Sequence, residues 1–237
     1  MPLYINCDMG EWDAPHLINQ DQLIMSHIDM CNIACGGHAG SAQIMAQTIE
    51  LAIAEDVFVG AHPGYSDRVN FGRSYIDLSD IDLKDTLQSQ IDLFLNVIDT
   101  FEINPYHIKP HGALYHACNQ MEKEMSVLIN LMKEQYSYLK LIVFPNSILH
   151  QTALKEGLDI MVESFIDRSY TLNLNLASRN MHGSVITSVV QANAQYQNLS
   201  NESVITQDGI TAQLVSQTAC IHGDNPNVLE ILESIHS

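Results

Sequence analysis

Short apolar runs alternate with longer stretches of helical period from one end of the chain to the other. The apolar runs predict seven β-strands, at residues 3–7, 30–34, 57–61, 106–109, 139–144, 160–165 and 218–222. Parallel neighbours need a crossover, and a right-handed crossover puts its helix outside the sheet. Strands that alternate with helices therefore predict an α/β protein with a parallel sheet.

Three of the intervening stretches carry helix signals. Ser79, with Asp82 three residues later, resembles a capping box at the start of the longest stretch. Apolar residues recur at helical spacing over residues 125–132. Pro226 is placed as the first residue of a last helix.

The segment 171–210 is less regular than the rest of the chain. It predicts a helix near 184–196, followed by a polar stretch at 197–201. No Pro-, Gly- or Ser-rich linker and no charge block interrupts the sequence. We therefore expect residues 1–237 to form a single domain.

Two architectures fit seven parallel strands, a closed β/α barrel and an open doubly wound sheet. Nearly every predicted strand is followed at once by Gly, His, Asp or Asn, as if all seven ends contributed to one rim. An open sheet would gather such residues at one switch point. The pattern therefore favours an irregular, TIM-like β/α barrel of about seven parallel strands.

The amino-acid composition argues against some classes of binding partner. Ten Lys and Arg against 28 Asp and Glu give a net charge of −18, which argues against nucleic acid and against an anionic membrane surface. No apolar run approaches the length of a membrane span, and the start of the chain lacks the pattern of a signal peptide. Five Cys without C-x-x-C spacing suit a reducing compartment, so a cytoplasmic location is expected, and homo-oligomers stay open.

Four histidines stand at predicted strand ends: His38, His62, His111 and His222. Taken alone, a histidine at a strand end is more often a hydrogen-bonded structural residue than a ligand or a base. Four such placements by chance are improbable, and the carboxyl ends of barrel strands meet at one rim. We therefore predict that the four imidazoles face one pocket.

Seven motifs span almost the whole chain in a fixed order. They are N-C-D-x-G-E at 6–11, N-I-A-C-G-x-H-A-G at 32–40, G-A-H-P-x-Y-x-D at 60–67, F-G-R at 71–73, K-P-H-G-A-L-Y at 109–115, F-x-D-R-x-Y at 165–170 and C-x-H-G-D at 220–224. By these motifs the chain resembles the lactam-utilisation (LamB/YcsF) family, whose members are the A subunits of bacterial 5-oxoprolinase. It departs from the family pattern at residues 12–15, at Ser41-Ala42 and at Ser74, which stands where a second Arg is usual.

The resemblance implies a barrel of the glycoside hydrolase and deacetylase type and an ATP-dependent activity. That activity is the opening of 5-oxo-L-proline (pyroglutamate) to L-glutamate, with ATP hydrolysed to ADP and phosphate. It also implies two further 5-oxoprolinase subunits, the B and C subunits. The chain has neither G-x-x-x-x-G-K-[ST] nor G-x-G-x-x-G after a strand, so we expect ATP and Mg²⁺ to bind mainly with or on partner subunits.

The resemblance also supplies candidate site residues. The candidate catalytic residues are Asp8, His38, His62, Lys109, His111 and His222. The candidate substrate-binding residues are Asn6, Glu11, Arg73, Tyr115, Asp167, Arg168 and Asp224. In this hypothesis Asp8 or a strand-end His acts as general base, Lys109 and His111 hold an oxyanion or phosphoryl oxygens, and an Arg binds the substrate carboxylate. For Arg168, a structural ion pair with Asp167 or Glu163 is the alternative.

Two other classes of function remain open. One is a metal-dependent amidohydrolase or deacetylase on a small cyclic amide or sugar amide. In that class Asp8, His38 and His62 would be metal ligands, and His111 or His222 would be the acid or base. The other is a non-catalytic binding or scaffold subunit, in which the histidines only hold a ligand.

Overall fold

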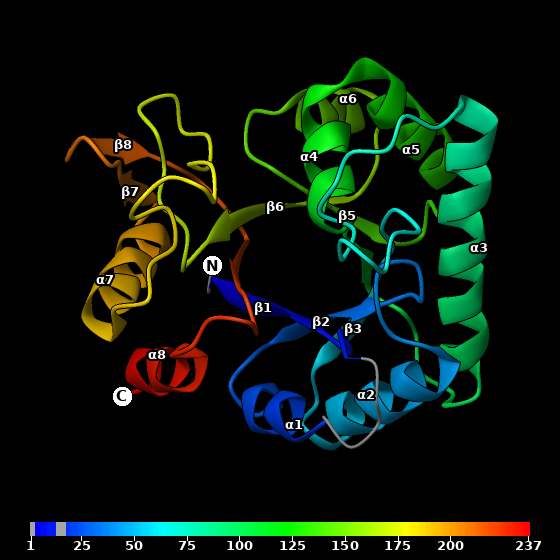
Figure 1. The fold of residues 1–237 in the computed structure, drawn as a ribbon, viewed down its shortest axis with the longest axis horizontal. Coiled ribbons are helices and arrows are strands. Elements are labelled where there is room, and N and C mark those ends of the chain that lie inside the picture. Colours follow the sequence, from blue (N-terminus) through cyan, green and yellow to red (C-terminus); the bar gives the residue numbers. More distant parts are fainter. Residues whose placement is uncertain (1–2, 13–17) are drawn as a thin grey trace.

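Seven parallel strands close into a barrel, which confirms the predicted fold class (Figure 1). The computed structural model describes residues 3–12 and 18–237. In order around the barrel the strands are β1 (Tyr4–Met9), β2 (Met30–Ala34), β3 (Phe58–His62), β4 (His107–Ile108), β5 (Lys140–Val143), β6 (Ile160–Phe165) and β9 (Thr218–Ile221). Pairing of β9 with β1 closes the ring.

The predicted strands lie within a few residues of the observed ones, and β2 and β6 coincide with their predictions. β4 is only two residues long where four were predicted. Its pairing with β3 nevertheless extends on both sides, since the N–H groups of Tyr106 and Lys109 donate to the carbonyls of Val59 and Ala61. These backbone hydrogen bonds fix the position of Lys109 relative to β3.

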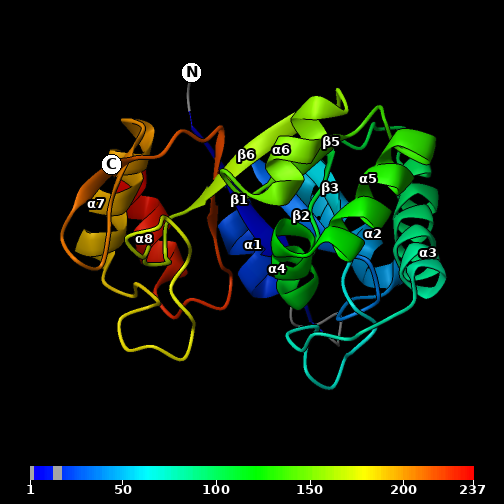
Figure 2. The same ribbon diagram turned by 90° about the horizontal axis from the view of Figure 1, so that it is seen from above.

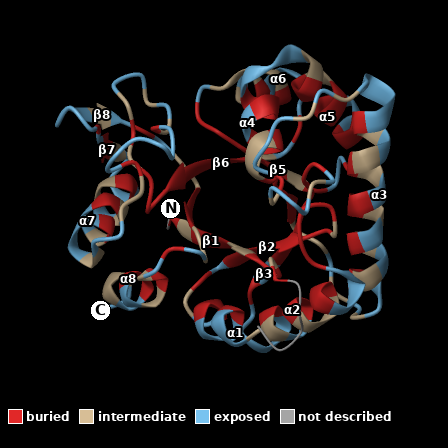
Figure 3. Cartoon of the chain, viewed as in Figure 1, coloured by how far each residue is buried: buried red, intermediate tan, exposed pale blue. Residues whose placement is uncertain are grey.

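Helices of the described chain surround the barrel (Figures 1 and 2). They are α1 (Asn19–Met25), α2 (Ala42–Ala54), α3 (Asp80–Asp99), α4 (Gly112–Gln120), α5 (Glu122–Gln135), α6 (Ile148–Lys155), α7 (Val189–Ser200) and α8 (Val228–Ile235). Figure 3 shows that the buried positions of these helices face the strands and the exposed ones face solvent. Within the described residues, no helix combines the length and the apolar character needed to cross a membrane.

Two of the predicted helix starts have different outcomes. The Ser79 hydroxyl accepts the N–H of Asp82 at 3.1 Å, so the predicted cap of α3 is confirmed. Pro226 does not begin the last helix, which starts at Val228. The side chain of Asn225 accepts the N–H of Asn227 at 3.1 Å, and this local turn occupies the residues between β9 and α8.

The segment after β6 differs most from its prediction. The polar stretch predicted at 197–201 largely continues α7, because Leu199 and the preceding buried residues of that helix keep one face on the core. Beyond it, β7 (Ser203–Ile205) and β8 (Thr211–Gln213) form an antiparallel hairpin outside the barrel, which the sequence analysis missed. Three-residue strands with polar ends carry too little alternation to be recognised.

The amino-terminal end of the barrel interior is apolar. Met30, Ile142 and Met161 form a buried cluster separate from the main core, and Tyr4 and Tyr106 pack against it. The main core lies instead between the strands and the surrounding helices. The apolar plug closes the barrel at the end opposite the strand-end motifs.

A hydrogen-bonded polar layer lies inside the barrel above this plug, formed by Asn6, Asn32, His107 and Thr218. Asn6 donates to the Thr218 hydroxyl at 2.8 Å, and Asn32 donates to the Asn6 side-chain oxygen at 2.8 Å. His107 Nε2 donates to the Asn32 side-chain oxygen at 2.6 Å, and burial lowers the pKa of His107 to about 3, so its ring is neutral. The layer links β1, β2, β4 and β9.

Gly60 on β3 makes room for this layer. A Cβ atom at that position would lie 2.3 Å from Nε2 of His107, and the His107 ring has no exposed surface into which it could move. Only glycine therefore lets the imidazole cross the barrel to reach Asn32.

We expect Gly60→Ala to lower the free energy of unfolding by about 1–3 kcal/mol, because the added methyl overpacks a closed interior. His107→Ala removes the atoms that the methyl meets, so the double variant should lose less stability than the two single losses added together. Urea unfolding of the four proteins measures this coupling. Strictly additive losses would show that Gly60 and His107 do not constrain each other.

Candidate active site

A cavity of about 850 Å³ opens at the carboxyl ends of the barrel strands. Of the predicted catalytic residues, its wall includes Asp8, His62, Lys109, His111 and His222. Of the predicted substrate-binding residues, its wall includes Glu11, Arg73, Tyr115, Arg168 and Asp224. His38, Asn6 and Asp167 lie behind this wall, each about 1% exposed or less.

The floor of the cavity is built on the buried ammonium group of Lys109. Its Nζ lies 2.8 Å from a carboxylate oxygen of Glu163 and 3.0 Å from Asp8 Oδ1. It also donates to Asn6 Oδ1 at 3.1 Å and to Cys220 Sγ at 3.2 Å. Burial alone would lower the pKa of Lys109, but the two carboxylates raise it well above its ordinary value.

These contacts decide what Lys109 can do. An ammonium group has three N–H bonds, and the protein already offers four acceptors for them. Lys109 therefore supplies positive charge beneath the cavity and holds Asp8, rather than presenting an unused donor to an oxyanion. Asn6, predicted to bind substrate, belongs to this support and to the polar layer below it.

Asp8 lies near the end of β1, and one of its carboxylate oxygens accepts two hydrogen bonds. Its Oδ1 accepts from Asn32 at 2.7 Å and from Lys109, while Oδ2 lies 3.4 Å from His62 Nε2. Burial opposes ionisation, but His62 and Lys109 outweigh it and hold the pKa of Asp8 well below its usual range. A carboxylate held ionised in this way is a weak base at neutral pH, so it suits charge stabilisation better than proton abstraction.

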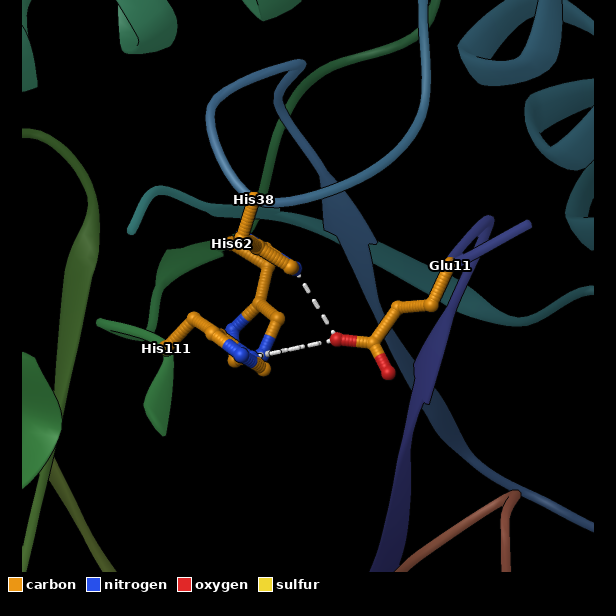
Figure 4. Close-up of side chains that lie close together, drawn as sticks. All are labelled: Glu11, His38, His62 and His111. Atoms are coloured by element: carbon orange, nitrogen blue, oxygen red, sulfur yellow. Dashed lines mark hydrogen bonds and ion pairs between the residues drawn. The ribbon is translucent and has the colours of Figure 1, made fainter. Parts of the chain in front are cut away.

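Three imidazoles and one carboxylate converge beside Asp8, and Figure 4 shows them pointing toward one another. We call Glu11, His38, His62 and His111 the imidazole cluster. Glu11 Oε1 lies 3.0 Å from His38 Nε2 and 3.1 Å from His111 Nδ1, and His111 Nδ1 lies 3.0 Å from His62 Nε2. Burial would raise the pKa of Glu11, but hydrogen bonds from His111 and His38 lower it, so the carboxylate is charged.

The second ring nitrogens of two of these histidines face backbone carbonyls. His62 Nδ1 lies 2.7 Å from the carbonyl of Lys109, and His111 Nε2 lies 2.9 Å from that of Phe71. A carbonyl oxygen only accepts, so both of these nitrogens carry a proton. The other ring nitrogens, His62 Nε2 and His111 Nδ1, therefore point into the cluster.

His38 is held by packing. Its ring stacks on that of His111 with centroids 3.6 Å apart and an interplanar angle of 3°, and burial lowers its pKa to about 4. Gly72, at φ +60°, lies against this stack, since a Cβ there would lie 2.9 Å from Cδ2 of the His111 ring and 2.9 Å from the Cβ of His38. The F-G-R segment thus serves the site through a glycine as well as through its arginine.

His222 and Asp167 form a separate pair across the cavity. His222 Nδ1 lies 2.8 Å from Asp167 Oδ1, and Asn225 donates to Asp167 Oδ2 at 3.1 Å. Burial of Asp167 opposes ionisation, but the charge and hydrogen bonds of His222 outweigh it and lower the pKa of this carboxyl. Asp167 therefore orients His222, whose Nε2 is left for the cavity, and does not itself meet a substrate.

The arginines at the cavity differ in their burial and in their partners. Arg168 is buried, and its guanidinium donates to the carbonyls of Ala177 at 2.6 Å and Ser184 at 3.3 Å. It therefore fixes the 177–184 loop, and among the described residues it makes neither of the ion pairs considered for it. Arg73 is about half exposed, donates to Asp224 at 2.7 Å and lies 4.9 Å above the Phe71 ring. Arg179 approaches the same carboxylate at 3.8 Å.

Several residues that build the site were not assigned roles from the sequence. Glu163, Asn32 and His107 all lie within or beside the motifs, but their roles depend on neighbours across the barrel. Gln195 of α7 donates to the carbonyls of Phe165, the last residue of β6, and of Ile166 and Arg168, which follow that strand. Nothing in the sequence around Gln195 signals this long-range contact.

The departures from the family pattern fall on the rim. Ser41 caps α2 by accepting the N–H of Ile44 at 3.3 Å, and Ser74 is exposed. Trp12 donates to Asp21 at 2.8 Å, whereas residues 13–15 lie outside the described part of the chain. The described departures therefore leave the cavity floor unchanged.

Comparisons with known proteins agree with this fold and cover nearly all of the chain. Proteins named as the A subunit of 5-oxoprolinase, from Syntrophobacter fumaroxidans and Pyrococcus abyssi, are 35% and 34% identical to it, over 98% and 99% of this chain and 92% of each of those proteins. The crystal structure of a lactam utilization protein from Thermus thermophilus superposes with a TM-score of 0.92 at 31% identity, over 99% of this chain and 94% of that one.

A more distant neighbour shares the fold alone. It is a proposed cellobiose-phosphate cleavage protein from Enterococcus faecalis V583, with a TM-score of 0.57 at 13% identity, over 99% of this chain and 90% of that one. The sequence model of the LamB/YcsF family, in contrast, matches residues 3–237. The resemblance inferred from the seven motifs is thus confirmed, and the chain belongs to the LamB/YcsF family.

Proposed function

We propose that this chain is the component of an ATP-dependent 5-oxoprolinase in which the lactam ring of 5-oxo-L-proline is opened to L-glutamate. One observation carries the proposal: relatives named as the A subunit of 5-oxoprolinase match 98% or more of the chain. The rim cavity supports it, because it combines an oriented imidazole with exposed arginine at its mouth.

The reaction sets three demands. A five-membered lactam is a resonance-stabilised amide, so its carbonyl carbon needs activation, an attacking water needs a base, and the leaving nitrogen needs a proton. Phosphorylation of the amide oxygen by ATP supplies the activation. Water then adds to the carbonyl carbon, the ring C–N bond breaks, and the nitrogen leaves as an amine, which gives γ-glutamyl phosphate. A second water hydrolyses this acyl phosphate to L-glutamate and inorganic phosphate.

His222 is the best-placed group for the proton transfers. Asp167 accepts the proton on Nδ1, which leaves the Nε2 lone pair to take a proton from water and return it to the leaving nitrogen. Asp8 is the weaker base because its pKa is held low. Both nitrogens of His111 and all N–H bonds of Lys109 already face protein groups, so we no longer assign these two residues to the oxyanion.

Arg73 is proposed to bind the substrate carboxylate. Its guanidinium uses one nitrogen on Asp224, and the planar fork that remains matches the geometry of a second carboxylate. Arg179, near the same Asp224 oxygen, adds positive charge at the mouth of a cavity in an otherwise acidic protein.

ATP with Mg²⁺ is proposed to bind on the partner B and C subunits or at the contact with them. The Gly36–Gly40 loop is a poor phosphate cradle, because Arg68 donates to the carbonyls of Gly36 and Gly40 and the following helix is capped by Ser41. The relatives are named as one lettered subunit of an enzyme, which agrees with such a complex.

A metal-dependent amidohydrolase or deacetylase is the second candidate function. The convergence of three imidazoles and Glu11 favours it. The two functions differ in their need for ATP: an amidohydrolase would release its product from a cyclic or sugar amide without nucleotide.

The isolated chain is expected to turn over 5-oxoproline very slowly or not at all, even with ATP and Mg²⁺, because it lacks a recognisable nucleotide site. Co-expression with the partner subunits should restore glutamate release. An assay of glutamate with and without partners and ATP checks this. Full-rate ATP-dependent turnover by the homogeneous chain would contradict the proposed division of labour.

Substitution of the His222–Asp167 pair tests the acid–base assignment. His222→Gln and Asp167→Asn should each lower turnover of the complex at least ~100-fold, since the first removes the base and the second disturbs its tautomer. His236→Gln, an exposed histidine outside the cavity, serves as the control. Unchanged turnover in His222→Gln would support the non-catalytic binding role.

The His222–Asp167 pair should also make the free energy of unfolding depend on pH. Because the pKa of Asp167 is lowered in the folded chain, its ionised form contributes stability that is complete at neutral pH and is lost as pH falls through the folded pKa. At pH 7 the Asp167→Asn variant should therefore have a lower free energy of unfolding than the wild type. This difference should shrink below pH ~4, near the ordinary pKa of aspartic acid. Urea unfolding at the two pH values measures it.

Arg73→Lys keeps the charge and loses the fork, so it should weaken use of 5-oxoproline about ten-fold or more, the equivalent of roughly 1.5–3 kcal/mol for a charge-assisted contact. The uncharged lactam 2-pyrrolidinone lacks the carboxylate, so its turnover should be nearly the same with the variant as with the wild type. Kinetics of both lactams with both complexes give the double difference. Equal losses on the two lactams would move carboxylate binding to Arg179.

A further inference from the structure

We propose that Glu11, His38, His62 and His111 together bind one divalent transition-metal ion at the wall of the cavity. This inference goes beyond the proposed function, because it concerns ion binding and not the lactam reaction. It also differs from the ligand set expected from the sequence, since Glu11 takes the place of Asp8 and His111 is added.

The first argument is the separation of the ligand atoms. Two ligands that each lie about 2.1 Å from a tetrahedral ion are about 3.4 Å apart. In the imidazole cluster the separations to Glu11 Oε1 are 3.0 Å for His38, 3.1 Å for His111 and 3.8 Å for His62, and the His62 to His111 separation is 3.0 Å. These four separations are close to the spacing of ligands in a first coordination shell, and all four ligand atoms lie within 4.8 Å of one another.

The second argument is the direction of the ring nitrogens. The carbonyls of Lys109 and Phe71 accept the protons of His62 Nδ1 and His111 Nε2. The other ring nitrogens, His62 Nε2 and His111 Nδ1, therefore face each other at 3.0 Å and are the atoms that can serve as ligands. Backbone carbonyls that orient ligating histidines in this way are the usual outer shell of protein metal sites.

The third argument compares the imidazole cluster with the other group of potential metal ligands in the cavity. Asp8, Cys220 and His222 form another group with suitable spacing, but the Lys109 ammonium lies 3.0 Å from Asp8 and 3.2 Å from Cys220 and repels a cation. The imidazole cluster has no such occupant among the described residues. Its carboxylate, Glu11, is the most exposed of its members, with 22% of the side chain accessible, and lies on the cavity side.

Three imidazoles and one carboxylate favour an ion such as Zn²⁺, Co²⁺ or Fe²⁺ over Mg²⁺ or Ca²⁺, which prefer oxygen ligands. The three histidines are at most 6% exposed, and Glu11 is the ligand that a substrate oxygen can join or displace. An ion held there would supply a Lewis acid to an oxygen that enters the cavity.

The test uses the full chain, stripped with a chelator and titrated with Zn²⁺ by calorimetry and with Co²⁺ by visible absorption, without lactam or ATP. We expect one ion per chain in the wild type, a dissociation constant at least ~100-fold weaker in Glu11→Gln and His62→Gln, and a Zn²⁺-dependent rise in melting temperature in the wild type alone. Because Glu11 is partly exposed, Glu11→Gln stays informative if His62→Gln fails to fold.

Two matched controls locate the ion. His222→Gln changes an imidazole of the same cavity and should bind the ion as the wild type does. His236→Gln removes the exposed stack of His27 and His236, whose ring centroids lie 5.8 Å apart, and should also leave binding unchanged.

Binding that survives Glu11→Gln and His62→Gln, or that is lost in His236→Gln, would place the ion elsewhere and overturn the proposal. A wild type that binds no ion would overturn it as well. Neither result bears on ATP-dependent glutamate release, so this proposal and the proposed function fail independently.

Discussion

The site depends on one positive charge buried in the barrel. Removing an ion from water costs several kcal/mol, so the Lys109 ammonium is stable at 3% exposure only with Glu163 and Asp8 held at 2.8 and 3.0 Å. Those two carboxylates come from β6 and β1, and the ion pairs tie distant parts of the chain together. The backbone carbonyl of Lys109 also accepts the Nδ1 proton of His62, so the residue that supports the cavity floor orients an imidazole of its wall.

From this floor the cavity divides into three chemically different parts. The imidazole cluster joins the ends of β1 to β4, the His222–Asp167 pair joins β9 to the segment after β6, and Arg73 and Arg179 surround Asp224 at the mouth. In the first two parts a buried group, His38 or Asp167, supports a group that faces the cavity. Such support from behind holds reactive groups in one geometry without occupying the space that a substrate needs.

Much of the fold was predictable because barrel strands are nearly continuous apolar runs. Strands β2 and β6 were predicted to the residue, and the Ser79 cap of α3 was recognised from its own local spacing. The errors fall on short polar segments. The strands of the hairpin β7–β8 are too short to show an alternating pattern, and a turn in which the Asn225 side chain accepts the N–H of Asn227 delays the start of α8 to Val228.

For the site, the sequence by itself determined which residues reach the rim, because a side chain that follows a parallel strand must emerge at its carboxyl end. It did not determine what each residue does there. Asn6 lies in the polar layer, Asp167 orients His222, and Arg168 holds a loop, although each was a candidate for binding substrate. The partners of Asn6 and Asp167 are 212 and 55 positions away in the chain, and the pairing of β9 with its neighbours brings them within hydrogen-bonding distance. Arg168 reaches Ala177, nine positions away, through the tertiary fold of its own loop.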